Sequence, residues 1–249
     1  MSKLHAYSTD ARNRLKVLSC IAAIAYGITA AISYIIPRLL EIAGLDAIYI
    51  IGLYSLVFLG IYWIYDKKAW VFVGNDIPDL GGTWMGCTLP NYQRDWPHLA
   101  IVTIEQNWSE IYIHEDAFFK NASAEPWDLD KRLGYNESIV AALKDNTAER
   151  SDLCILYEHI GLGKEQPNFK GSYNLLYLSN ENKLVGNYFT NRSVSIHSPE
   201  GLTRKEGSQG PLILRRISNK ILTTTEALAT ATESNAIKQI EAEIMKRKI

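Results

Sequence analysis

The side chains best suited to hold a ligand are grouped in one short segment, residues 186–192, which reads Gly-Asn-Tyr-Phe-Thr-Asn-Arg. Alternate side chains of a β-strand point to opposite faces, so in a strand Tyr188, Thr190 and Arg192 share one face. That face combines an aromatic ring that can stack on a base, a hydroxyl, and a guanidinium that binds phosphate through paired hydrogen bonds. The pattern predicts a ligand-binding face, although an aromatic ring packed in a barrel beside a surface cation would give the same residues.

Two more aromatic residues extend this prediction. Tyr173 lies on the preceding candidate strand, and Trp84 lies on the first candidate strand between Gly82 and Gly86. The predicted ligand-binding residues are therefore Trp84, Tyr173, Tyr188, Thr190 and Arg192. Packing in the protein core is the alternative role for each aromatic ring.

No pattern in the sequence predicts catalysis. The chain contains no nucleophile elbow, no HExxH motif, no paired CxxC and no phosphate-binding loop. Its five histidines never fall at metal-ligand spacing, and His114 and His159 are expected to be hydrogen bonded or exposed at strand ends. The three cysteines do not make a disulfide framework. The sequence therefore predicts a binding protein and not an enzyme, with no catalytic residue, no metal site and no cofactor.

The candidate site residues fall in a region of short alternating segments that begins after Gly74. Eight candidate strands cover residues 82–89, 98–106, 109–118, 137–144, 152–160, 170–178, 183–193 and 210–217. Hairpin-length links favour an antiparallel meander, and closing it removes the exposed edges. We predict an eight-stranded up-and-down β-barrel, with an open sandwich as the second choice. Such a barrel is filled by side chains or holds one small ligand, and the longer connection 119–136 is expected at its rim.

Two apolar segments precede the predicted barrel. Residues 17–36 and 47–65 contain no charged side chain, and each is long enough for a helix to cross a hydrocarbon core of about 30 Å. A signal peptide is the competing interpretation of the first segment, but the run is too long and a second one follows at once. A buried helical hairpin of a soluble protein is the other alternative. We predict two transmembrane helices.

The basic residues around these segments predict their orientation. Four Lys or Arg residues precede the first segment and Lys67 and Lys68 follow the second, whereas the short loop between them has only Arg38. Because Lys and Arg are enriched on the cytoplasmic side, both termini and the large domain are expected in the cytoplasm. The net charge of −1 gives no sign of a nucleic-acid polymer as partner.

The predicted organisation has three parts. Residues 1–74 hold the N-terminus and the helical hairpin, residues 75–218 the barrel, and residues 219–249 a tail. The first half of the tail is rich in Thr, Ala, Ser and Glu and is interpreted as a polar linker. Ile237, Ile240 and Ile244 follow at helical spacing and predict a short amphipathic helix, which docks on the barrel or a partner, or frays as a solvated terminus.

The two apolar segments, the stretch Asp-Ile-Pro-Asp-Leu-Gly-Gly-Thr-Trp-Met-Gly at residues 76–86 and the stretch at 186–192 together give the chain a recognisable layout. It resembles the two-transmembrane β-barrel effectors of bacterial CBASS antiphage systems. Gly-X-Trp-X-Gly also opens lipocalin-like barrels in general. The tail beyond Ser218 is not explained by the resemblance.

The resemblance implies a signalling role. A partner nucleotidyltransferase would make a cyclic dinucleotide during infection, and the cytosolic barrel would bind it. Protomers would then associate into a homo-oligomer, and the spans would disrupt the bacterial inner membrane. The alternative is a membrane-anchored lipocalin-like binding protein or scaffold for an apolar ligand or protein partner, with an apolar interior and Arg192 in solvent. A membrane-bound hydrolase would require clustered titratable groups in a pocket.

Overall fold

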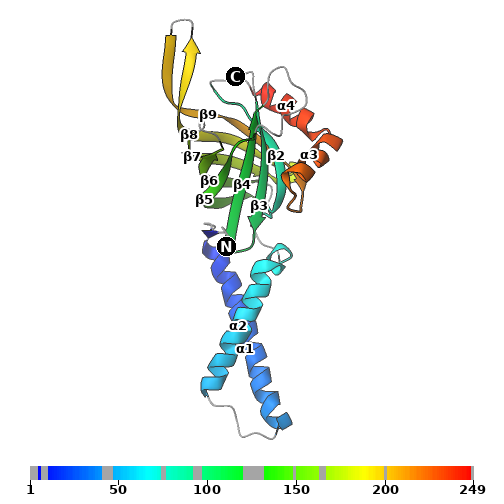
Figure 1. The fold of residues 1–249 in the computed structure, drawn as a ribbon. Coiled ribbons are helices and arrows are strands. Elements are labelled where there is room, and N and C mark those ends of the chain that lie inside the picture. The colour runs from blue at the N-terminus through cyan, green and yellow to red at the C-terminus, as the bar shows by residue number, and fades with distance from the viewer. Residues whose placement is uncertain are drawn as a thin grey trace. The chain divides into compact units, whose positions relative to one another are not determined.

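The computed structural model describes nine stretches of the chain, namely residues 5–6, 11–40, 47–73, 77–91, 97–119, 132–147, 150–162, 167–198 and 201–247. The chain forms two compact units. One unit is Asp10–Ile77, and the other combines Met1–Thr9 with Pro78–Ile249. The first unit is helical and the second is built around a β-barrel (Figure 1).

The helical unit is a hairpin of α1 (Ala11–Leu40) and α2 (Ala47–Lys67), followed by a short 3-10 turn, η1 (Ala69–Val71). The two helices contact each other and cross (Figure 1). Ile21, Ala25 and Thr29 are buried at intervals of four residues, so one stripe of α1 forms the contact. The small residues Gly27 and Ala30 lie outside this stripe and are exposed.

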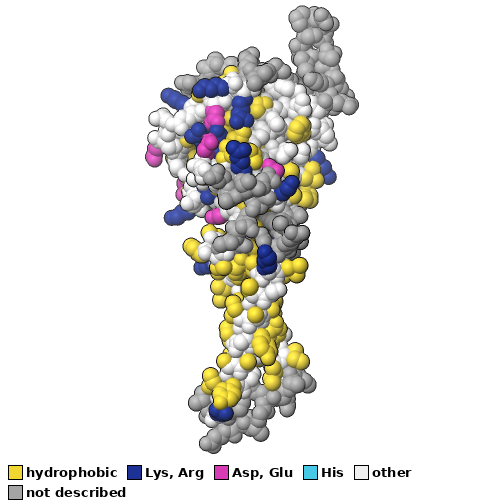
Figure 2. Space-filling view, turned by 180° about the vertical axis from the view of Figure 1, so that it is seen from behind, with side chains coloured by type: hydrophobic (Ala, Val, Ile, Leu, Met, Phe, Trp, Pro, Cys, Tyr) yellow, Lys and Arg dark blue, Asp and Glu magenta, His cyan; other side chains and the backbone are white. Residues whose placement is uncertain are grey.

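Both helices contain a segment long and apolar enough to cross a membrane. Arg14–Ile36 has a mean hydropathy of 1.9 and Tyr49–Lys67 of 1.4, which matches the two predicted spans closely. Only 17% and 11% of these segments are buried, and large apolar side chains such as Leu56 and Trp63 are exposed. Figure 2 shows hydrophobic side chains over much of the visible surface of the two helices.

The second unit contains an eight-stranded antiparallel β-barrel, which confirms the predicted fold. Its strands are β2 (Gly82–Thr88), β3 (His98–Gln106), β4 (Glu110–Phe119), β5 (Arg132–Thr147), β6 (Arg150–Gly161), β7 (Phe169–Leu178), β8 (Lys183–Ser198) and β9 (Gly201–Ser218). Each strand pairs with its neighbours in sequence, and β9 pairs with β2 to close the barrel. The predicted turn before β8 is a 3-10 turn, η2 (Ser179–Glu181), followed by Asn182 with a left-handed φ of 48°.

One strand comes from the other end of the chain. The two residues of β1 (His5–Ala6) pair with Ile111 and Glu110 of β4. On the same side of β4, the ladder with β5 runs only from His114 to Phe118. The strand β1 therefore covers a part of the β4 edge that β5 leaves open, just before the chain enters α1.

The structure corrects two predicted boundaries. First, β5 begins at Arg132, so the last five residues of the predicted long connection belong to a strand. Second, β8 and β9 run on to Ser198 and Gly201 as a two-stranded ribbon beyond the barrel (Figure 1). The register shifts between Thr190 and Ser193, where the ribbon leaves the barrel wall. Here the two strands pair only with each other.

The tail forms two helices, α3 (Thr224–Glu233) and α4 (Ala236–Lys246), which pack on the outside of β2 and β9. Ile240 and Ile244 are completely buried in one apolar cluster with barrel residues, and Ile237 packs against it. Glu243 of α4 forms ion pairs with Lys183 and with Arg215, the latter at 3.1 Å. The predicted short amphipathic helix is thus confirmed, and of the alternatives left open by the sequence the helix docks on the barrel.

The segment interpreted as a polar linker is largely α3. Thr223 and Glu226 form a capping box at its start, in which each side chain bonds to the backbone N–H of the other. Ala227, Leu228 and Ala231 are buried against the barrel. Because α3 and α4 cover β2, this strand is buried on both faces and cannot show the alternation of a half-exposed strand.

Candidate functional site

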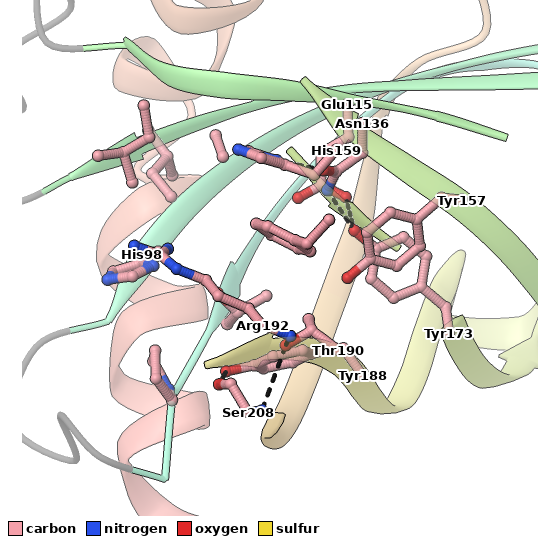
Figure 3. A pocket seen from close by; sticks show the side chains of 16 residues that line it. His98, Glu115, Asn136, Tyr157, His159, Tyr173, Tyr188, Thr190, Arg192 and Ser208 are labelled. Carbon is pink, nitrogen blue, oxygen red and sulfur yellow. Dashed lines mark hydrogen bonds between the residues drawn. The ribbon is translucent and has the colours of Figure 1, made fainter. Parts of the chain in front are cut away.

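A cavity lined by both polar and apolar side chains opens at the end of the barrel where β3, β5 and β7 begin (Figure 3). It is lined by Thr88, Pro90, His98, Leu99, Glu115, Ala117, Leu133, Asn136, Tyr157, His159, Phe169, Tyr173, Tyr188, Thr190, Arg192 and Ser208. All eight strands contribute to this lining. The cavity volume is about 80 Å³, several times the 10–15 Å³ or so that one water requires, so the barrel end can admit part of a small ligand.

Four of the five predicted ligand-binding residues meet at this cavity. Tyr188, Thr190 and Arg192 line it from β8, and Tyr173 lines it from β7. The predicted alternation along β8 is confirmed, since Phe189 points to the opposite face and is 44% exposed. The cavity thus brings together an aromatic ring, a hydroxyl and a guanidinium, as the spacing in the sequence suggests.

Trp84 does not line the cavity and lies further along the barrel. Its indole N–H donates a hydrogen bond of 2.9 Å to the carbonyl of Leu80, and its ring meets the edge of Tyr177. The Arg216 guanidinium lies 4.8 Å from the centroid of the Trp84 ring. Trp84 is fully buried in these contacts, which hold the other end of the barrel together.

A chain of hydrogen bonds runs through the inner part of the cavity. His159 Nδ1 lies 2.7 Å from Asn136 Oδ1, Asn136 Nδ2 donates to the Tyr173 hydroxyl at 2.6 Å, and that hydroxyl donates to Glu115 Oε2. Since the Asn136 oxygen can only accept, His159 carries its proton on Nδ1 in this arrangement. The four residues come from four different strands and are all buried. The chain therefore fixes the orientation of each polar group in the cavity wall.

Burial sets the ionisation of these groups. Desolvation raises the pKa of Glu115 above its ordinary value, against the opposing effect of hydrogen bonds from Tyr173 and Asn136. Burial, followed by the nearby Glu115, also holds the pKa values of Tyr157 and Tyr173 well above the usual range. The inner wall thus presents neutral hydroxyls and a carboxyl whose charged form is disfavoured.

Flat ring pairs form two sides of the cavity. The rings of Tyr157 and Tyr173 stack with centroids 4.3 Å apart, and those of His159 and Phe169 stack at 4.2 Å. Gly171 makes room for the first pair, because a Cβ there would lie 2.4 Å from the Tyr157 ring. Stacked rings of this kind give the cavity planar surfaces that suit a planar ligand.

Arg192 supplies a positive charge beside these rings. Its guanidinium lies 5.7 Å from the Phe169 ring centroid, and no carboxylate within the described part of the chain forms an ion pair with it. Burial first and the charge of Arg192 second lower the pKa values of His98 and His159 to about 4. At neutral pH the described lining of the cavity therefore presents one cation, Arg192, and two neutral imidazoles, those of His98 and His159. Figure 3 labels these three side chains.

Sequence reasoning missed Glu115, Asn136, Tyr157, His98 and His159 as cavity residues. A signal existed for Glu115, since it continues the period-2 series of Ile111 and Ile113, which are both buried. The expectation that His159 is hydrogen bonded at a strand end is correct, but the residue also lines the cavity. His114 lies outside this cavity and is bonded to Asp116 at 3.0 Å.

The lowered pKa of His159 predicts a loss of stability in acid. The ordinary pKa of histidine is 6.5, so the unfolded chain takes up a proton at His159 below this pH, whereas the folded protein does so only near pH 4. The contribution of neutral His159 to stability is therefore complete above pH 6.5 and is lost as the pH falls toward 4. When the pH falls from about 7 to about 4.5, the free energy of unfolding should decrease in both proteins. The decrease should be roughly 2 kcal/mol smaller in His159→Gln than in the native chain. Urea denaturation of the full chain in detergent measures this, and equal losses for both proteins would contradict it.

Across the residues with assigned positions, no group of three or more His, Cys, Asp and Glu side chains is arranged to hold a metal ion. Comparison of the chain with models of known protein families, with characterised proteins and with solved structures finds no match. The interpretation of the site therefore depends on its geometry and charge.

Proposed function

We propose that the chain is a ligand-gated membrane effector whose barrel binds a cyclic dinucleotide messenger. The observation that carries this function is the position of Arg192, which lines the cavity beside stacked aromatic rings and has no acidic partner among the described side chains. A cation of this kind is stabilised by an anionic ligand, and a phosphate suits the guanidinium fork. A base can stack on the adjacent rings.

The size of the cavity determines how such a ligand would bind. At about 80 Å³ the cavity is smaller than sites that enclose a drug-sized ligand, which occupy about 300–1,000 Å³. One base of the dinucleotide would enter between the ring pairs, and a phosphate would lie near Arg192. The rest of the ligand would stay at the open end, where a second protomer could reach it.

The helical unit would act in the bilayer. Its long, apolar and largely unburied helices suit two spans of a bacterial inner membrane, with both termini in the cytoplasm. Gly27 and Ala30 are exposed on α1, and small residues of this kind allow helices of neighbouring protomers to approach closely in lipid. Ligand binding would drive protomers to associate and disrupt the membrane. Such an effector serves antiphage defence when a nucleotidyltransferase supplies the messenger.

The position of Arg192 disfavours the alternative of a carrier for an apolar ligand. An apolar ligand in this cavity would remove water from the guanidinium without replacing its hydrogen bonds, at a cost of several kcal/mol or more. An open apolar cavity with Arg192 in solvent would have favoured the carrier. The cavity wall instead contains Glu115, Asn136 and His159 joined by hydrogen bonds.

The clustered titratable groups do not favour a hydrolase over a binding site. The Thr190 hydroxyl accepts a backbone hydrogen bond from Ser208 at 3.2 Å, and the Ser208 hydroxyl pairs with Tyr188 at 3.1 Å. His159 bonds to Asn136, which is not a nucleophile. A cavity whose hydroxyls are engaged in this way suits recognition of a ligand.

Calorimetric titration of the full chain in detergent with a panel of cyclic dinucleotides tests the proposal. We expect at least one to bind, and Arg192→Gln to weaken its binding by about 30-fold, or roughly 2 kcal/mol, through loss of a charge-assisted phosphate contact. Lys170→Gln is the matched control, because Lys170 is an exposed cation on β7 near the same end of the barrel. Folded protein that binds none of the panel would refute the messenger, and unchanged affinity in Arg192→Gln would remove that residue from the site.

A further inference from the structure

We propose that Arg192, His98 and His159 form one anion subsite, which takes up a proton from solvent when a phosphate or other oxyanion binds. The identity of the messenger as the physiological anion rests on the proposed function. The subsite itself depends only on these three residues. They come from β8, β3 and β6, which are separate strands of the barrel wall, and all three line one cavity. Figure 3 shows the Arg192 side chain directed toward His98.

The three side chains are coupled through the cavity. Arg192 lies over the Phe169 ring, and the other partner of that ring is the stacked imidazole of His159. The charge of Arg192 acts on both His98 and His159, where it adds to burial in disfavouring their protonated forms. An oxyanion beside the guanidinium reverses this effect, because a nearby negative charge favours imidazolium. The subsite can therefore change from one positive charge to as many as three as the anion enters.

The hydrogen-bond chain decides which atom of His159 receives the proton. Its Nδ1 already donates to Asn136 Oδ1, so the proton adds to Nε2. The protonated Nε2 then becomes a donor to the anion, which the neutral imidazole cannot be. This tautomer is fixed before binding by Asn136, Tyr173 and Glu115, so no rearrangement is required.

The other titratable groups that line the cavity are Glu115, Tyr157, Tyr173 and Tyr188. Burial raises the pKa values of the first three, so the two tyrosines among them stay neutral over the range in which histidine titrates. Glu115 is the one group that competes for the proton, since an incoming anion also favours its neutral form. The substitution Glu115→Gln removes this competitor and leaves an oxygen to accept from Tyr173.

The sign of the pH dependence follows from the proton uptake. If an anion raises the histidine pKa values, its affinity is lowest near pH 8, where both imidazoles are neutral, and increases as the pH falls toward 5. Each histidine whose pKa rises by one unit strengthens binding by up to about tenfold. A subsite made of Arg192 alone would bind with the same affinity throughout, because the guanidinium does not titrate there.

Sulfate is a suitable probe because its charge stays constant over this interval. The full chain in detergent, labelled with ¹⁵N-histidine, has only five histidine signals to follow. We expect saturating sulfate to raise the pKa values of His98 and His159 by at least about one unit each. At constant pH it should leave the chemical shifts of His114, which lies outside the cavity, unchanged. Histidines whose pKa values rise from about 4 to about 5 are half protonated at pH 5 when the anion is bound. Sulfate affinity should therefore increase about threefold or more from pH 8 to pH 5, in the native chain and in Glu115→Gln alike. Arg192→Gln should abolish sulfate binding.

Three results would overturn the subsite: no sulfate binding at millimolar concentration, pH-independent affinity, or histidine pKa values that do not respond. The NMR signals of the native chain report the histidine pKa values even if a His159→Gln variant fails to fold. The sulfate experiment is independent of the messenger. If sulfate binds with proton uptake but no dinucleotide binds, the cyclic dinucleotide is refuted and the subsite is supported. If a dinucleotide binds without proton uptake, the messenger is supported and the subsite is refuted.

Discussion

Replacing Ile240 with Asp should destabilise the barrel unit by at least about 4 kcal/mol, a large part of the roughly 5–15 kcal/mol that stabilises a typical domain. Ile240 is completely buried between α4 and the barrel wall, in the same apolar cluster as Met85 and Ile213. The substitution removes a large aliphatic side chain and places a carboxylate in a buried apolar cluster. Thermal unfolding of the full chain in detergent, followed by near-ultraviolet circular dichroism, measures the loss.

Lys238→Asp is the control for this substitution. Lys238 lies on the same helix but is exposed, so the same new carboxylate should change the free energy of unfolding by no more than about 0.5 kcal/mol. Native-like unfolding of Ile240→Asp would mean that the tail does not contribute to the stability of the barrel. It would then act as a separate appendage, one of the alternatives that the sequence allows.

Trp84→Ala should be nearly as damaging, with a loss of about 3–5 kcal/mol. The substitution leaves a large cavity, removes the ring beneath Arg216 and breaks the hydrogen bond to Leu80. Trp84→Phe keeps one aromatic ring but loses the second ring of the indole together with its N–H donor, so its cost should be smaller, at about 2 kcal/mol. Chemical denaturation of the two variants measures the difference.

Trp84→Phe and Arg192→Gln together separate stability from ligand binding. Because Trp84 lies outside the cavity lining, Trp84→Phe should bind a ligand with native affinity, whereas Arg192→Gln should lose affinity and keep its stability. A large loss of affinity in Trp84→Phe at unchanged stability would instead place Trp84 in the binding site, in agreement with the sequence-based prediction.

Local patterns in the sequence predict the barrel well. Alternating side chains such as Tyr188, Phe189 and Thr190 identify both a strand and its two faces, because the period of two is a property of the strand itself. Hairpin-length links then imply that each strand pairs with the next. The pairing of β9 with β2 follows from the need to cover sheet edges.

The composition of the cavity is harder to predict, because it depends on contacts between distant residues. Glu115, Asn136 and His159 meet only because β4, β5 and β6 pair in one register, and Asn136 sits in a segment whose sequence resembles a loop. The pKa of His159 depends on Arg192, which is two strands away. No spacing within a single strand reports such neighbours.

The tail shows a different cause of error. A composition rich in Thr, Ala and Ser hides the helix α3, although Thr223 and Glu226 have the spacing of a capping box. Its apolar stripe consists mainly of alanines and one leucine, Leu228, so the helical period is weak. Contact with the barrel stabilises a helix that its own sequence only partly specifies.

The short strand β1 has a practical consequence for how the barrel can be isolated. A recombinant fragment that starts after α2 loses His5 and Ala6, and with them the backbone partners of Ile111 and Glu110. The N–H and C=O groups at this part of β4 would then be open to pairing with any extended chain, including another copy of the fragment. Aggregation or artificial dimers of such a fragment would arise from the cut itself. A linker that fuses residues 1–9 to residue 78 would restore the missing strand and keep the edge covered.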